Sequence, residues 1–192
     1  MSQNAKKQLW LLAGGNGSGK STFYRTQLKS RGLPFINADN IAKEVFPESP
    51  EAHSYHAAAI AEKLRNELLE EGTSFCFETV FSHPSKIDFL AQAKAHGYET
   101  ILVFVHLKSA ELNKARISQR IEEGGHAVPE EKVESRIPRT MQNIKTAILI
   151  ADQTYLLDNS DYQKPFKLVA KIVGGEMSAS YPLPDWVKFL TE

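Results

Sequence analysis

The stretch that decides the fold is residues 14–22, which read Gly14-Gly15-Asn16-Gly17-Ser18-Gly19-Lys20-Ser21-Thr22. They fit the pattern G-x-x-x-x-G-K-[ST], whose glycines let the backbone approach phosphates, whose lysine reaches the β- and γ-phosphates and whose hydroxyl ligates Mg²⁺. An apolar run at residues 9–13 predicts a buried strand before the loop, and residues 21–28 predict a helix after it. Because the pattern works in this strand–loop–helix context, we predict a site for ATP or GTP and Mg²⁺. Its residues are Gly14, Asn16, Gly17, Ser18, Gly19, Lys20, Ser21 and Thr22, with Ser21 as the metal ligand.

Composition indicates a single domain without a strong charge field. The 192 residues suit one α/β domain, over residues 1–192, with enough chain for a proper core. Lysine plus arginine and aspartate plus glutamate both number 23, so no net charge favours binding to nucleic acid or to an anionic membrane. The polar residues 1–8 and the short apolar run after them fit neither a signal peptide nor a membrane span. We therefore expect a cytoplasmic protein without a nucleic-acid or membrane partner.

Strand-like apolar runs alternate with helical periodicity along the chain, which is typical of a parallel α/β sheet. We predict strands at residues 9–13, 35–39, 75–79, 100–107, 154–157 and 167–173, and helices at residues 51–71, 85–96, 109–125 and 130–150. The predicted fold is a three-layer α/β/α P-loop NTPase, like a nucleotide kinase, with a central, mostly parallel sheet. Residues 109–140 are expected to form a helical lid, and residues 178–192 a C-terminal segment that docks on the core.

Polar residues follow several predicted strands at their carboxyl ends, where open α/β sheets bind ligands. Asp39 ends the second strand, Glu78 and Thr79 end the third, and Asn159 follows the fifth. Asp39 is a candidate catalytic base or water-mediated metal contact, although it can instead cap a helix that begins at the next residue. Glu78 and Thr79 are candidates for substrate binding, and Asn159 is a candidate for nucleotide binding. Residues 75–78 come nearest to a Walker B strand, with Glu78 in place of the usual aspartate.

Four arginines of the expected lid are candidates for neutralising a transferring phosphate. Arg116 and Arg120 are four residues apart on one predicted helical face, and Arg136 and Arg139 follow on the next helix. Arginine suits this task because it stays charged and presents a planar fork of donors, and a kinase lid needs a movable segment that carries such groups. The alternative is a solvated, charged helix. His126 is expected in a turn or in lid packing rather than as a base.

These motifs together resemble the zeta-toxin-like P-loop kinases, in particular a small bacterial branch labelled predicted ATPases. The resemblance spans about residues 9–159. It rests on the phosphate loop, Asn37-Ala38-Asp39, Phe77-Glu78-Thr79, and the element Arg120-x-x-x-Gly-Gly-His-x-Val-Pro that leads to Arg136-x-x-Arg139. It implies an ATP- and Mg²⁺-dependent kinase that phosphorylates a hydroxyl of UDP-N-acetylglucosamine.

The resemblance also implies roles for individual residues. Asp39 matches the aspartate that acts as base, Glu78 matches the glutamate that contacts the sugar, and two lid arginines match Arg120 and Arg136. Residues 40–43 hold no arginine where zeta toxins commonly carry one, and the chain is short for a sugar-nucleotide kinase, so the phosphotransfer machinery carries over and the substrate does not. The candidate catalytic residues are Asp39, Lys20, Arg120 and Arg136, and the candidate substrate-binding residues are Glu78, Thr79, Arg116 and Arg139.

Three functions remain open on the sequence. The first is a zeta-toxin-type kinase for a small-molecule hydroxyl acceptor, the toxin of a pair whose antitoxin covers the nucleotide site. The second is a housekeeping kinase for a nucleoside, sugar or sugar acid on the same scaffold. The third is a regulatory module that binds or slowly hydrolyses ATP and signals through a partner, against which the acidic residues Asp39 and Glu78 argue. The sequence does not determine the acceptor, the choice between ATP and GTP, or the oligomeric state.

Overall fold

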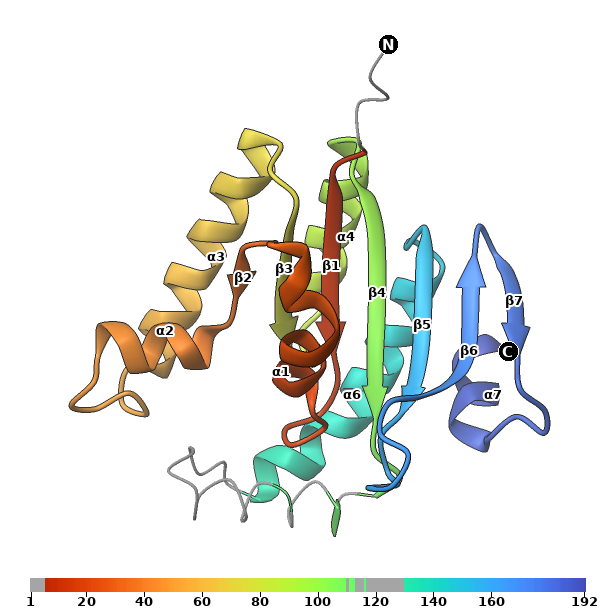
Figure 1. The fold of residues 1–192 in the computed structure, drawn as a ribbon. Coiled ribbons are helices and arrows are strands. Elements are labelled where there is room, and N and C mark those ends of the chain that lie inside the picture. The colour runs from red at the N-terminus through yellow and green to blue at the C-terminus, as the bar shows by residue number, and fades with distance from the viewer. Residues whose placement is uncertain (1–5, 110, 113–115, 117–129) are drawn as a thin grey trace.

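The computed structural model of the protein describes residues 6–109, 111–112, 116 and 130–192. Within these residues a seven-stranded sheet lies between helices, in the strand order β2-β3-β1-β4-β5-β6-β7 (Figure 1). The first five strands of this order are parallel, and β6 and β7 are antiparallel to their neighbours. The strands are β1 (Gln8–Ala13), β2 (Phe35–Ile36), β3 (Phe75–Thr79), β4 (Glu99–His106), β5 (Gln153–Asp158), β6 (Lys167–Val173) and β7 (Glu176–Ala179).

Helices cover both faces of the sheet (Figure 1). On one face lies α1 (Lys20–Phe23), which continues as a π-helical turn at Tyr24–Leu28, and on the other lie α4 (Ser85–Ala95) and α6 (Glu130–Ile148). The remaining helices are α2 (Ala38–Val45), α3 (Ser54–Glu71) and α7 (Asp185–Thr191). A mostly parallel sheet between two helical layers is the three-layer arrangement of P-loop NTPases, which confirms the predicted fold class.

The core follows the alternation of side chains along the strands. Leu9 and Leu11 of β1 pack into the cluster formed with α3, α4 and α6, whereas Trp10 and Leu12 pack into the cluster on the α1 face. Residues 100–105 of β4 are buried without interruption, because helices cover this central strand on both sides. The phosphate loop therefore starts from the most firmly packed part of the sheet.

Two strand predictions differ from the structure. The second strand ends at Ile36 because the Asn37 side chain caps a helix: its Oδ1 accepts hydrogen bonds from the N–H groups of Asp39 (2.7 Å) and Asn40 (3.1 Å). Asp39 therefore lies in the first turn of α2, neither at a strand end nor at the cap position. The strand β7 was not predicted; it returns from β6 through a turn of two glycines, residues 174–175, which both have positive φ.

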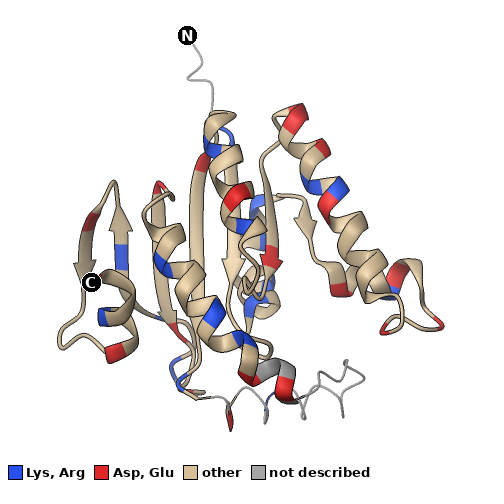
Figure 2. Ribbon diagram, turned by 180° about the vertical axis from the view of Figure 1, so that it is seen from behind, with Lys and Arg blue, Asp and Glu red and all other residues tan. Residues whose placement is uncertain are grey.

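The predicted helix at residues 109–125, and with it much of the expected lid, lies mostly outside the described residues. Near the end of the chain, α7 packs Val187 and Leu190 into the core, and the Trp186 ring stacks on the His106 ring with the centroids 4.3 Å apart. Of the helices that the structure describes, none is long and apolar enough to cross a bilayer. Basic and acidic residues are interspersed along the helices (Figure 2).

Candidate active site

The phosphate loop joins β1 to α1 at the carboxyl edge of the sheet. Gly14 and Gly19 have φ values of +150° and +100°, which disfavour any other residue. A Cβ atom on Gly14 would clash with the carbonyl oxygen of Val105 on β4, and one on Gly19 would lie 2.6 Å from Nδ2 of Asn159, after β5. Glycine at these two positions thus lets the loop lie against the end of β4 and against the segment that follows β5.

The Lys20 side chain curls back over the loop. It is only 7% exposed, and its Nζ donates hydrogen bonds to the carbonyl oxygens of Gly14 and Gly15, both at 2.9 Å. A buried ammonium group is tolerated only when its donors find acceptors. These contacts keep a positive charge at the loop, where backbone N–H groups can also hold an anion.

Ser21 and Glu78 meet beside the loop. The Ser21 hydroxyl donates to Oε2 of Glu78 at 2.7 Å, although the two residues are 57 positions apart in the chain. The parallel pairing of β3 with β1 brings them together, because its register sets Glu78 opposite Leu12 near the start of the loop. Mg²⁺ in P-loop proteins is held by a loop hydroxyl and a strand-end carboxylate, with phosphate oxygens and waters completing its shell. The two side chains therefore fit a magnesium ion.

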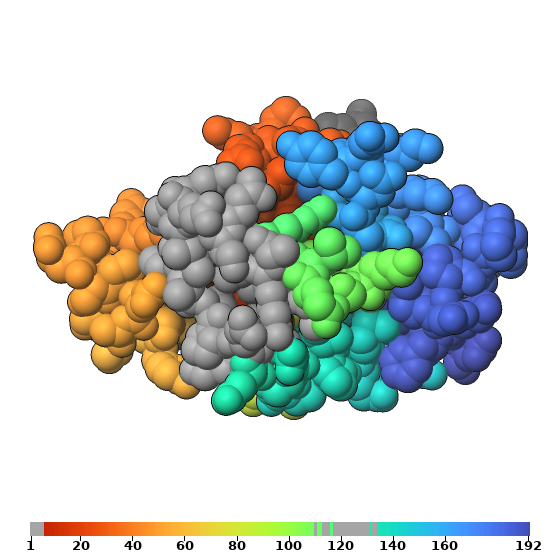
Figure 3. All heavy atoms as spheres, turned by 90° about the horizontal axis from the view of Figure 1, so that it is seen from below, coloured from red at the N-terminus to blue at the C-terminus, as the bar shows by residue number. Residues whose placement is uncertain are grey.

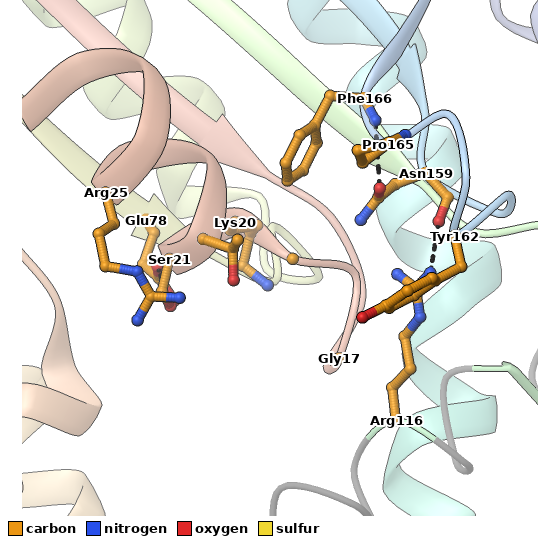
Figure 4. A pocket seen from close by; sticks show the side chains of 12 residues that line it. Gly17, Lys20, Ser21, Arg25, Glu78, Arg116, Asn159, Tyr162, Pro165 and Phe166 are labelled. Carbon is orange, nitrogen blue, oxygen red and sulfur yellow. Dashed lines mark hydrogen bonds between the residues drawn. The ribbon is translucent and has the colours of Figure 1, made fainter.

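A pocket of about 600 Å³ opens beside these residues. Lys20, Ser21 and Glu78 lie on one side of it, and Asn159, Tyr162 and Phe166 lie on the other (Figure 4). Seen from below, the first helix after the loop and the segment after β5 lie side by side at this edge of the molecule (Figure 3). The pocket is lined by Gly17, Gly19, Lys20, Ser21, Thr22, Arg25, Glu78, Arg116, Asn159, Tyr162, Pro165 and Phe166.

Sequence reasoning missed four of these lining residues: Arg25, Tyr162, Pro165 and Phe166. Arg25 follows Ser21 by four positions and so lies on the same side of the helix. The other three belong to the loop after β5, which leaves the carboxyl edge where ligands of such sheets bind. The signal for them is the position of the whole connection after β5, and not only of Asn159, at the carboxyl end of a strand.

Asn159 joins the phosphate loop to this second wall of the pocket. Its side chain is 5% exposed; Nδ2 donates to the carbonyl oxygen of Ser18 at 2.8 Å, and Oδ1 accepts from the N–H group of Phe166 at 3.1 Å. The backbone oxygen of Asn159 accepts from Nη2 of Arg116 at 2.8 Å. The predicted nucleotide-binding residue thus lines the pocket and uses both ends of its amide on protein groups.

Three of the four candidate arginines lie in the described residues. Arg116 lines the pocket, and Nη1 of Arg136 donates to Oδ1 of Asn16 in the phosphate loop at 3.4 Å. Arg139 is exposed, and its Nε bonds a carbonyl oxygen of its own helix. Arg120 lies outside the described residues. The structure therefore brings Arg116 to the pocket and Arg136 to the phosphate loop, and leaves Arg139 on the surface of α6.

Asp39 and Thr79 are absent from the described lining of the pocket. Asp39 is exposed in the first turn of α2. The Thr79 hydroxyl accepts from the N–H group of Phe81 at 3.1 Å, and Phe81 is a buried residue with a φ of +65°. Thr79 thus supports the turn after β3. Both residues still lie at the carboxyl edge, since β3 pairs with β1 and β2 pairs with β3.

Two groups of the central sheet have pKa values that burial shifts. Burial lowers the pKa of His106, at the end of β4, to about 4, and the charge of Asp158 opposes this shift. Burial raises the pKa of the Cys76 thiol in β3, which keeps it neutral as a core residue. In the described part of the chain, no three histidine, cysteine, aspartate or glutamate side chains gather as a metal centre of that kind requires.

Solved structures share this fold. The complex of AvrRxo1-ORF1 and -ORF2 with ATP matches with a TM-score of 0.75 and 18% identity, and the match covers 99% of this chain but only 65% of the longer chain. The PezAT chromosomal toxin–antitoxin system of Streptococcus pneumoniae matches with a TM-score of 0.68 and 19% identity, over 88% of this chain and 72% of the other. At such identities the likeness concerns the fold alone.

Sequence comparison goes further than the fold. An uncharacterized protein of Haemophilus influenzae is 30% identical over 138 residues, which make up 68% of this chain and 98% of that protein. The family model described as an AAA domain matches residues 9–142, from β1 and the phosphate loop through β3 and β4 into α6. Because this match covers more than half of the chain, the protein belongs to that AAA-domain family.

Proposed function

We propose that the protein is a Mg²⁺- and ATP-dependent kinase of zeta-toxin type, which transfers a phosphoryl group to a hydroxyl of a small molecule. The observation that carries the proposal is the convergence of Lys20, Ser21 and Glu78 beside one pocket. Phosphoryl transfer depends chiefly on positioning and on neutralising negative charge. These side chains supply a cation, a hydroxyl and a carboxylate at the edge of the sheet where such a reaction needs them.

The loop and the aromatic wall would hold the nucleotide. The amides of the phosphate loop and Lys20 would bind the phosphates, and Tyr162 and Phe166 would bind the base, since a flat base suits an aromatic surface. Packing supports the Phe166 ring, which meets the Phe23 ring edge-on with the centroids 5.4 Å apart. Stacking on an aromatic ring does not distinguish adenine from guanine, so every assay includes GTP as a competitor.

We assign Glu78 to the metal rather than to the acceptor. The resemblance to zeta toxins implies a sugar contact, but the hydrogen bond from Ser21 at 2.7 Å makes Glu78 the acidic partner of the hydroxyl that P-loop proteins use for Mg²⁺. When bound, the ion supplies positive charge that offsets the charge of the phosphates. Glu78 and Ser21 would share its protein coordination.

Asp39 is the proposed base for the acceptor hydroxyl. It follows β2, which lies two strands away from β1 in the sheet. Neighbouring strands are about 4.8 Å apart, so this offset is roughly 10 Å, which leaves room for an acceptor between the carboxylate and the phosphate loop. Arg116 and Arg136, with Arg120 and Arg139 from the same part of the chain, are the proposed cations for the transferring group.

The acceptor and the biological role rest on resemblance. UDP-N-acetylglucosamine is the first candidate acceptor. The PezAT structure is that of a toxin–antitoxin system, and AvrRxo1-ORF1 forms a complex with ORF2. We therefore propose that this protein acts as a toxin in the cytoplasm and that a small antitoxin covers its nucleotide site. Neither a nucleic acid nor a membrane is a proposed partner.

A mass-spectrometric screen tests the kinase activity. The protein is incubated with Mg·ATP and with UDP-sugars, nucleosides, sugars or sugar acids, and Lys20→Ala serves as the blank. Phosphorylated UDP-N-acetylglucosamine would support the full zeta-toxin assignment, and a different phosphorylated acceptor would favour a housekeeping kinase. ATP binding without transfer to any acceptor would refute the kinase and favour a regulatory module. Growth arrest on expression that requires both Lys20 and Asp39 would identify a toxin.

Substitution of the proposed catalytic base, Asp39, gives a sharper test. We expect Asp39→Asn to bind ATP as the wild type does and to lose transfer by about a hundredfold or more, because general-base catalysis contributes 10²–10⁴. Glu44→Gln is the matched control, because it removes another exposed carboxylate from the same helix. Unchanged turnover in Asp39→Asn, measured by product mass, would remove Asp39 from the mechanism.

A further inference from the structure

A buried arginine on α3 lies against two aromatic rings. Arg65 is 5% exposed, and its guanidinium carbon lies 5.0 Å from the ring centroid of Phe77 and 5.4 Å from that of Phe89. Among the described residues no carboxylate lies within ion-pair distance of it, and its buried Nε has no hydrogen-bond partner. Burial lowers the pKa of Arg65, and the charge of Glu62 only opposes this shift. A guanidinium group this deeply buried ordinarily has an anion beside it.

A second cation, Lys86, lies on α4 three positions before Phe89, over whose ring the Arg65 guanidinium lies. Lys86 lies half-buried in the first turn of α4, where its Nζ donates to the Ser85 hydroxyl at 3.2 Å. Burial first, and then the nearby charge of Arg65, lowers the pKa of Lys86, and the charge of Glu62 opposes this shift. At this end of α4 the N–H group of Ser85 donates to Nδ1 of His83 at 3.2 Å, and the first turn carries the carboxylate of Asp88. Two like charges in one partly apolar place favour the arrival of an anion.

The pair lies next to the proposed reaction site. Phe77, on which Arg65 stacks, directly precedes Glu78 on β3, and Lys86 follows the loop that leaves this strand. Helix α6 holds that loop, because Thr140 donates to the carbonyl oxygen of Val80 at 2.9 Å. Both α3 and α4 lie on the same face of the sheet (Figure 2). This is the face opposite α1, so an anion held here would not compete with the nucleotide phosphates.

We propose that Arg65 and Lys86 form a subsite for an anionic group, a carboxylate or a phosphate, on the hydroxyl acceptor. The inference rests on the proposed kinase function and deepens it by naming the class of acceptor. Arginine binds both anions through its planar fork, and lysine adds a point charge. A neutral sugar would bring no negative charge to the two cations.

Matched pairs of acceptors test this subsite. UDP-N-acetylglucosamine is compared with N-acetylglucosamine for the phosphate, and gluconate with glucose for the carboxylate. We expect transfer to a charged member and not to its neutral partner, and we expect Lys86→Gln to raise KM about tenfold with little change in kcat, as for loss of a charge-assisted hydrogen bond. Equal use of charged and neutral acceptors, or an unchanged KM, would overturn the proposal.

A binding measurement separates this subsite from the kinase function. Inorganic phosphate, or acetate in a second arm, is added to protein saturated with Mg·ADP, and the rise in Tm is recorded. We expect one of the two anions to raise Tm in the wild type and in the control Lys63→Gln, whose side chain is 80% exposed on α3, but not in Lys86→Gln. Such a rise without transfer to any acceptor would support the subsite and refute the kinase. Arg65→Gln repeats the test if it folds, and failure of both anions to raise Tm would refute the subsite.

Discussion

Asn159→Asp changes one atom of the contact that joins the two walls of the pocket. An aspartate keeps the oxygen that accepts from Phe166 but replaces Nδ2, which donates to Ser18 at 2.8 Å, with a second oxygen. The carbonyl oxygen of Ser18 then faces an acceptor in a place that is 95% shielded from water. A buried group without its partner costs about 1–3 kcal/mol, and more when a charge is involved. We expect the variant to lose about 3 kcal/mol of unfolding free energy at pH 7.5, a large part of the 5–15 kcal/mol typical of a domain.

The sign of the pH dependence follows from the same geometry. Burial and the facing carbonyl oxygen raise the folded-state pKa of the new carboxyl above its unfolded value of about 3.9. Below the unfolded pKa both states hold the proton, the neutral acid can donate to Ser18, and the variant approaches the wild type. The stability gap then widens as pH rises through the folded pKa. Asn159→Ala, by contrast, leaves Ser18 and Phe166 without partners at every pH.

Urea unfolding at pH 4.5 and pH 7.5 provides the assay. Asn66→Asp on α3 is the control, since the Asn66 side chain has no hydrogen bond among the described residues. The Kd for Mg·ADP is measured in parallel. Because Asn159 supports both walls of the pocket, we expect the affinity for Mg·ADP to fall as the stability difference between variant and wild type grows. A gap that is the same at the two pH values would show that Nδ2 does not donate to Ser18, and the reasoning would fail.

Two further substitutions test the site and its surroundings. Glu78→Gln should lower affinity for Mg·ATP while leaving metal-free ATP binding nearly unchanged, because the amide removes the charge that pairs with Ser21 and attracts the ion; calorimetry with and without Mg²⁺ measures this, and equal losses in both would exclude a metal role. His106→Gln should make the free energy of unfolding depend less on pH between 6.5 and 4. The pKa of His106 is lowered from 6.5 to about 4, so the folded state binds fewer protons, and the wild type loses up to roughly 3 kcal/mol as pH falls from 6.5 to 4. Parallel stability curves for the two proteins over that range would contradict this.

Local patterns predicted the phosphate loop and its strand, and contacts between distant segments decided the rest. The loop could be predicted because its glycines, Lys20 and Ser21 act within nine consecutive residues. The partner of Ser21 could not, because the register of β3 against β1 depends on packing of the whole sheet. The predicted strand over residues 35–39 was wrong at its end, although a local signal was present. The side chain of Asn37 caps a helix, and it accepts the hydrogen bonds of the N–H groups of Asp39 and Asn40 that strand pairing would otherwise use.

The second wall and the buried arginine show what one sequence does not reveal. Phe166 lies in the pocket because Oδ1 of Asn159 holds its N–H group and its φ is +55°, and no motif marks such a loop. Arg65 occurs on a helix whose periodicity fits a surface helix, so its charge suggests exposure until the neighbours are known. In both cases the decisive fact is burial, which depends on segments far away in the chain.

The hydrogen bond between Ser18 and Asn159 can form only after the ribosome has made Asn159, so the phosphate loop is completed late in synthesis. The two residues are 141 positions apart, so a ribosome that adds 5–20 residues per second makes Ser18 about 7–28 s before its partner. Throughout this delay a nascent chain carries the loop sequence without the support of β5 and the segment after it. A growing polypeptide therefore cannot assemble the complete nucleotide pocket. If the finished protein is a toxin, translation itself provides an interval in which a neutralising partner can be made before activity begins.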